Sequence, residues 1–125
     1  MSLPNPTDAE LAVLKVLWNR GPSTVRTVHD ALSAERSLGY TTVLKALQVM
    51  TDKGLVERDE SERSHVYAPT RTESQTQRTL LGDLMERAFG GSAASLVIQA
   101  LSARKASREE RDEIRRILDE VGGEP

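Results

Sequence analysis

The spacing of apolar residues changes once within the first 70 residues, and this change limits the possible fold more than any other feature. Up to residue 54, apolar side chains recur every three or four residues in three separate segments, which is the period of an amphipathic helix. From Leu55 to Ala68 two short segments follow a period of about two, as strands do. The sequence therefore predicts three helices followed by a two-stranded hairpin, which is the order of a winged helix-turn-helix module.

Capping and turn residues set the boundaries of these elements. Thr7 and Glu10 have the spacing of a capping box, and Gly21-Pro22 ends the segment that follows. Gly54 ends the third helix in the same way. We expect helices over 8–20, around Val25–Leu32 and over 41–53, and strands over 55–58 and 65–68 on either side of a charged tip.

Three more helical segments follow the hairpin. Thr72 with Gln75, and Ser107 with Glu110, again have capping-box spacing. The segment between them, Ala93 to Ala103, is apolar on almost every side, so we expect it to be buried. The predicted fold is mainly α with a small β-hairpin.

We predict a winged-helix DNA-binding domain over residues 1–70 and a helical dimerisation domain over residues 71–125. The tail carries more apolar surface than so short a segment can cover, so we expect a second copy to cover it. A two-fold dimer would place two recognition helices about 34 Å apart, which is one turn of DNA. The residues expected in the dimer seam are Leu81, Leu84, Met85, Phe89, Leu96, Val97, Leu101, Ile114, Ile117 and Leu118.

The composition argues against several classes of function. The chain has no cysteine, which excludes disulfides, thiolate metal sites and thiol nucleophiles. His29 and His65 have no ligand-like spacing, and no nucleophile with a base or pair of catalytic carboxylates is evident. We therefore expect no enzyme, no metal and no cofactor. No apolar run approaches the roughly 20 residues that span a bilayer, so we expect a cytoplasmic protein without membrane insertion.

The third helix has a polar face opposite its apolar stripe, made of Thr41, Thr42, Lys45 and Gln48. Short donors and acceptors of this kind suit the major groove of B-DNA, which is about 12 Å wide. Any surface helix has a polar face, so this face alone is weak evidence for DNA binding. The hairpin that follows the third helix is what favours a DNA-binding function. Further contacts, to backbone phosphates, are expected from Arg26 and from the cations of the hairpin, Arg58, Arg63 and His65.

The net charge of −2 opposes this interpretation, because phosphate binding normally needs a basic surface. Residues 1–70 contain 8 basic and 9 acidic side chains. Only charges within about 8 Å of a phosphate contribute strongly, however. Whether this chain can bind DNA therefore depends on where its cations lie, including Arg26 and Lys53.

Several motifs together resemble the BlaI/MecI penicillinase repressors, a family that also includes copper-responsive CopY-type members. They are Thr7-Asp8-Ala9-Glu10 with Val16-Leu17-Trp18, Tyr40-Thr41-Thr42-Val43, Lys53-Gly54-Leu55-Val56, Arg63-Ser64-His65-Val66-Tyr67, and, in the tail, Phe89-Gly90-Gly91-Ser92 with Ser95-Leu96-Val97. The resemblance implies a dimeric repressor on palindromic operators. It also implies DNA contacts by Thr41, Thr42, Lys45 and the wing near Arg63.

In penicillinase repressors, a membrane-bound sensor metalloprotease that detects β-lactams starts proteolysis of the tail, between an asparagine and a phenylalanine. Gln99 and Ala100 occupy those positions here, so the resemblance implies a proteolytic site without fixing β-lactam as its signal. The cysteine motif of the copper-responsive members is absent. Val49 stands where several relatives have arginine on the recognition helix, so operator preference can differ.

Two alternatives remain open. A winged helix can serve as a protein-interaction module, which the acidic net charge favours. A DNA-binding regulator can also respond to a small-molecule effector in its tail, where Met85 and Phe89 would either line a pocket or pack in the core.

Overall fold

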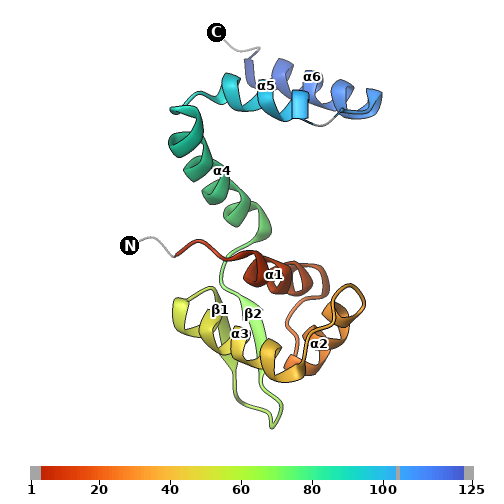
Figure 1. Ribbon diagram of the computed structural model, residues 1–125, viewed down its shortest axis with the longest axis vertical. Helices are drawn as coiled ribbons and strands as arrows, with labels where there is room; N and C mark the ends of the chain where they lie inside the picture. Colours follow the sequence, from red (N-terminus) through yellow and green to blue (C-terminus); the bar gives the residue numbers. More distant parts are fainter. Residues whose placement is uncertain (1–3, 104, 123–125) are drawn as a thin grey trace. The chain divides into compact units, whose positions relative to one another are not determined.

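The computed structural model describes residues 4–103 and 105–122. The chain divides into two compact units between Leu80 and Leu81. Within the described ranges the elements are α1 (Asp8–Arg20), α2 (Val25–Ser33), α3 (Tyr40–Lys53), β1 (Val56–Asp59), β2 (Val66–Pro69), α4 (Glu73–Phe89), α5 (Ala93–Ala103) and α6 (Arg108–Gly122) (Figure 1). This order confirms the predicted fold class.

Local capping accounts for the helix boundaries. The Thr7 hydroxyl accepts a hydrogen bond from the Glu10 N–H at 3.2 Å, and the Glu10 carboxylate accepts one from the Thr7 N–H at 2.9 Å. Thr72 with Gln75, and Ser107 with Glu110, form the same reciprocal pairs. Because two otherwise unpaired backbone donors are satisfied in each box, the helices begin where the sequence predicts.

Both strands lie one residue later than predicted. Gly54 is left-handed, with φ 82°, and the Leu55 N–H still donates to the Met50 carbonyl at 2.9 Å. Leu55 therefore completes the end of α3 and does not begin the ladder. The antiparallel register then pairs Val56 with Pro69 and Asp59 with Val66.

The edge of β2 that does not face β1 is also hydrogen-bonded, to the segment between α1 and α2. The Ser23 N–H donates to the Tyr67 carbonyl at 3.0 Å, and the Tyr67 N–H donates to the Ser23 carbonyl at 2.8 Å. β2 thus lies between β1 and the extended residue that joins α1 to α2. The hairpin loop extends beyond the helices (Figure 1).

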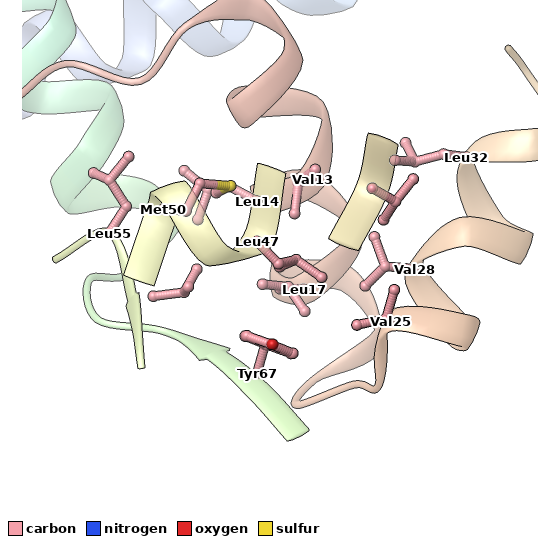
Figure 2. Close-up of a cluster of buried hydrophobic side chains, with 12 residues drawn as sticks. Val13, Leu14, Leu17, Val25, Val28, Leu32, Leu47, Met50, Leu55 and Tyr67 are labelled. Atoms are coloured by element: carbon pink, nitrogen blue, oxygen red, sulfur yellow. The ribbon is translucent and has the colours of Figure 1, made fainter. Parts of the chain in front are cut away.

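One hydrophobic core joins the three helices and the hairpin (Figure 2). Tyr67, from β2, is the largest of the fully buried side chains and is 1% exposed. Burial of each such side chain contributes about 1.5–3 kcal/mol, so the hairpin is held firmly against the helices. The core residues are Val13, Leu14, Leu17, Val25, Val28, Leu32, Val43, Leu47, Met50, Leu55, Val56 and Tyr67.

A buried carboxylate links the start of α1 to the end of α3. Glu10 is only 6% exposed, and its Oε2 lies 2.8 Å from Lys53 Nζ. Burial raises the pKa of the Glu10 carboxyl, but the hydrogen bonds and charge of Lys53 and the Thr7 hydrogen bonds outweigh it, so the net pKa lies below its ordinary value of 4.5. Glu10 therefore stays ionised at neutral pH.

The second unit is helical, and its described residues form no buried core of their own. No described residue of α4 or α5 is buried. The expectation that residues 93–103 are buried is therefore wrong for a single chain: Val97 is 43% exposed and Ile98 is 60% exposed. So few helices cannot surround a helix that is apolar on every side. Among the described residues, no helix combines the length and apolar character needed to cross a membrane.

Candidate nucleic-acid interface

The polar face of α3 lies on the surface of the first unit. Thr41, Thr42, Lys45 and Gln48 are all exposed, as their pattern in the sequence suggests. The opposite face carries Val43, Leu47 and Met50, each at most 1% exposed. The core therefore fixes which side of the helix turns outward, and that side carries short donors and acceptors.

The start of α3 differs from the starts of α1 and α2. Thr7 and Thr24 cap α1 and α2 with their side chains, whereas Gly39 at the start of α3 has no side chain to do so. The first backbone N–H groups of a helix point outward, and the helix dipole makes this end attractive to anions. This end is therefore chemically suited to a phosphate oxygen.

His29 holds the turn that leads into α3. Its Nε2 lies 2.9 Å from the Leu38 carbonyl oxygen, which can only accept, so Nε2 carries the proton and donates. The His29 ring also meets the Tyr40 ring edge-on, with 5.9 Å between ring centroids. The half-buried position of His29 fits the prediction of an ordinary surface or boundary residue.

Arg26 lies over the Tyr40 ring, with its guanidinium carbon 5.1 Å from the ring centroid. The predicted phosphate contact Arg26 is exposed and lies next to the first residue of α3. Sequence reasoning missed Tyr40. The available signal was an aromatic residue at the start of the recognition helix, shortly after an arginine and a histidine one helical turn apart.

The wing leaves one arginine without an internal partner. Arg58 pairs with Glu60, its Nη2 lying 2.8 Å from a carboxylate oxygen, and the Tyr67 hydroxyl and the Glu60 carboxylate raise the pKa of Arg58. Arg63 is exposed, and within the described residues its side chain forms no hydrogen bond or ion pair. His65 is half-buried and lies directly before β2. Arg63 is thus the wing cation best placed to meet an outside anion.

Lys53 is less suited to phosphate than the sequence suggests, because its ammonium contacts Glu10 at 2.8 Å. Thr41, Thr42 and Lys45 instead border a shallow hollow of about 330 Å³ next to Thr7 and Glu10. The cations of the third helix therefore have different roles. Lys45 faces outward, and Lys53 joins two helices.

The tail residues predicted to form a dimer seam are open to solvent or partly so in the single chain. Met85, Phe89, Leu96 and Ile114 are half-buried. The exposed members are Leu81, Leu84, Val97, Leu101, Ile117 and Leu118, with exposed fractions between 43% and 61%. Gln99 and Ala100 are also exposed, within α5.

The sequence pattern that defines the penicillinase repressors matches residues 6–120. The chain belongs to the penicillinase repressor family. The resemblance found in the motifs is confirmed by this match. Family membership makes the chain a DNA-binding transcriptional repressor, as predicted, and not an enzyme.

Known relatives agree over nearly the whole length of this repressor. The transcriptional regulator BlaI of Mycobacterium tuberculosis (strain H37Rv) is 38% identical over 116 residues, which is 91% of this chain and 83% of that protein. The penicillinase repressor of Bacillus licheniformis is 29% identical over 118 residues, or 94% of this chain and 92% of the relative. Such coverage includes both units.

A solved structure of B. licheniformis BlaI, in its monomeric form in complex with the blaP half-operator, has the same winged-helix architecture. It superposes with a TM-score of 0.52 at 30% identity and covers 58% of this chain and 89% of that one. The predicted winged helix-turn-helix fold is confirmed by this match.

Proposed function

We propose that this repressor binds a palindromic operator as a homodimer, with α3 of each copy in the major groove. The observation that carries the proposal is the exposed polar face of α3, whose opposite side is fixed in the core. The winged helix of a relative at 30% identity has been solved in complex with a half-operator, which supports DNA binding by the corresponding unit here.

Each predicted contact has a role that its chemistry suits. Gln48 can pair with both the N6 amino group and N7 of adenine, and Lys45 can reach guanine or the backbone. Thr41 and Thr42 contact a thymine methyl or a phosphate. Arg26, Arg63 and His65 bind the backbone, where contacts set affinity and register more than sequence preference. The acidic side chains between them matter less, since salt screens exposed charges beyond about 8 Å.

The exposed apolar surface of the tail supports dimerisation. Ile98 and Leu118 are each about 60% exposed, and Val121 is 78% exposed. A second copy would remove these side chains from water, at roughly 25 cal/mol per Å² of apolar surface. The polar side of α6 carries ion pairs such as Arg115 with Asp112, which can remain in solvent. A two-fold axis through the tail would match the symmetry of a palindromic operator.

Control by proteolysis is the finer part of the proposal. We place the cut between Gln99 and Ala100, which are exposed but helical. Cleavage there separates Leu101 and all of α6 from the rest of the seam, and so weakens the dimer. A membrane-bound sensor protease would start this response. The repressor itself acts at the chromosome, and we place it in the cytoplasm.

The test is selection of duplexes from a randomised library by the full chain, followed by binding measurements over a range of salt concentrations. A repressor selects a palindrome and loses affinity steeply as salt rises. An interaction module shows no selection and no retention at low salt, which would overturn the proposal. A regulator with a small-molecule effector also selects a palindrome, but it releases the duplex when a metabolite extract is added.

A further inference from the structure

Arg26, His29 and Tyr40 form a cluster where α2 meets the first residue of α3. The Arg26 guanidinium carbon lies 5.1 Å from the centroid of the Tyr40 ring. The His29 ring approaches the same ring edge-on, at 5.9 Å with 62° between the planes. Tyr40 is 40% exposed and Arg26 is exposed, so the guanidinium is both supported by the ring and open to solvent.

The ring is itself held in place from α2. His29 Nε2 donates to the Leu38 carbonyl at 2.9 Å, which fixes the turn before α3. Tyr40 follows two residues later as the first residue of that helix. The Tyr40 ring, on which Arg26 lies, therefore belongs to the recognition helix and follows a turn that His29 holds.

A supported arginine binds an anion better than a free one. The negative face of an aromatic ring attracts a guanidinium. An unsupported arginine has many rotamers and loses them when it binds. Because the Tyr40 ring already restricts Arg26, less conformational entropy remains to be lost on contact with an anion.

The position of the cluster indicates which anion it meets. In helix-turn-helix docking, the helix before the recognition helix crosses the DNA backbone. Arg26 is on that helix, beside the start of α3, whose N–H groups lack a side-chain cap. A phosphate of the duplex is the anion that fits both features.

We propose that Tyr40 is a positioning residue for DNA binding, whose ring holds Arg26 against a backbone phosphate of the duplex. This inference rests on the proposed function. It adds that Arg26 and Tyr40 act as a unit, and that their effect does not depend on the base sequence. A phosphate contact should therefore affect an arbitrary duplex as much as the selected operator.

The experiment is a double-mutant cycle with Arg26→Gln and Tyr40→Leu in the full chain. Binding is measured to the selected operator and to an arbitrary duplex of about 30 base pairs, over a range of salt concentrations. Arg26→Gln should lower the slope of log affinity against log salt by about 0.9, the value for one phosphate contact. Tyr40→Leu should weaken binding about two- to fivefold. In the Tyr40→Leu background, Arg26→Gln should reduce DNA affinity by a smaller factor than it does in the parent.

Two matched variants separate this role from a structural one. Tyr40→Phe keeps the ring face and should keep both the affinity and the coupling to Arg26. Arg20→Gln removes an exposed arginine that lines a groove between α1 and α2, and should leave the salt slope unchanged. Fluorescence of Trp18, the single tryptophan, checks that each variant is folded.

Additive effects of the two substitutions would overturn the inference, as would a loss for Tyr40→Phe equal to that for Tyr40→Leu. An effect confined to the operator would also overturn it, because a phosphate contact is shared by all duplexes. If the parent chain binds neither duplex, the proposed function fails and takes the inference with it. If the parent binds and only the coupling is missing, the inference alone fails.

Discussion

Replacing Glu10 with glutamine should destabilise the first unit and remove part of its acid sensitivity. The Glu10 carboxylate is 6% exposed and accepts hydrogen bonds from the Thr7 N–H at 2.9 Å and from Lys53 Nζ at 2.8 Å. Glutamine keeps the volume and an acceptor for Thr7 but loses the charge that faces Lys53. We therefore expect the capping box to survive and the ion pair to fail.

The magnitude follows from the surroundings of the two partners. A hydrogen bond to a charged group contributes about 1.5–3 kcal/mol. The Lys53 side chain is 31% exposed and can turn to water when its partner is lost, which reduces the penalty. We expect Glu10→Gln to cost about 1–2 kcal/mol at pH 7. Glu10→Ala also loses the cap, worth about 1 kcal/mol, so it should cost about 2–3 kcal/mol in total.

The pH dependence has a definite sign. The pKa of Glu10 is lowered in the folded state, so its contribution is complete above the ordinary value of 4.5 and is lost as the pH falls through the lower folded value. As the pH falls from neutral to below the folded pKa of Glu10, the free energy of unfolding should therefore decrease more for the parent than for Glu10→Gln. Below the folded pKa the two proteins should differ little.

The assay is urea unfolding at several pH values, followed by Trp18 fluorescence. Trp18 lies in the first unit, and its Nε1 donates to the Arg71 carbonyl at 2.9 Å, so it reports on that unit. Asp8→Asn, an exposed change in the same helical turn, is the matched control and should cost no more than about 0.5–1 kcal/mol. A constant difference in stability between the parent and Glu10→Gln across the acid range would show that Glu10 does not contribute to the acid sensitivity.

Three further predictions concern the interface and the tail. Lys45→Ala should lower the operator affinity measured by titration about 5- to 150-fold, the range for loss of a base contact. The control Lys15→Ala on α1 should leave that affinity unchanged. Equal binding isotherms for Lys45→Ala and the parent would exclude a role for Lys45. Leu101→Asp and Leu96→Asp should each raise the dimer dissociation constant, measured by sedimentation, roughly 100-fold, because an unpaired carboxylate would be buried in the seam. If a variant still sediments like the parent dimer, the substituted residue does not lie in the seam. Gln48→Ala should change the selected operator sequence more than the affinity for arbitrary duplexes, and an unchanged selection would contradict direct base contact.

Elements set by neighbouring residues were predictable from the sequence. α1 and α5 have their predicted bounds, and the reciprocal bonds at Thr7, Thr72 and Ser107 begin their helices as expected. A capping box needs only residues three apart, so the sequence contains all of its information. The one-residue shift of the strands came from Leu55, whose N–H completes α3.

Contacts between distant segments were not predictable in the same way. Lys53 looked like a cation for phosphate, but it pairs with Glu10, 43 residues away in the sequence. Tyr40 gained its importance from Arg26 and His29 across a turn. The apolar pattern of residues 93–103 predicted burial, but such a pattern does not say whether the same chain or a second copy would provide it.

The central claim is that the polar face of α3 enters the major groove twice in each assembly. Because the chain has no cysteine, Asp52→Cys, at an exposed position of α3 one helical turn after Gln48, provides a single attachment point for an iron chelate that cleaves nearby DNA. With the selected operator, we expect two clusters of cleavage in the major groove, about one helical turn apart. Cleavage spread evenly along the duplex, or confined to one cluster, would contradict it.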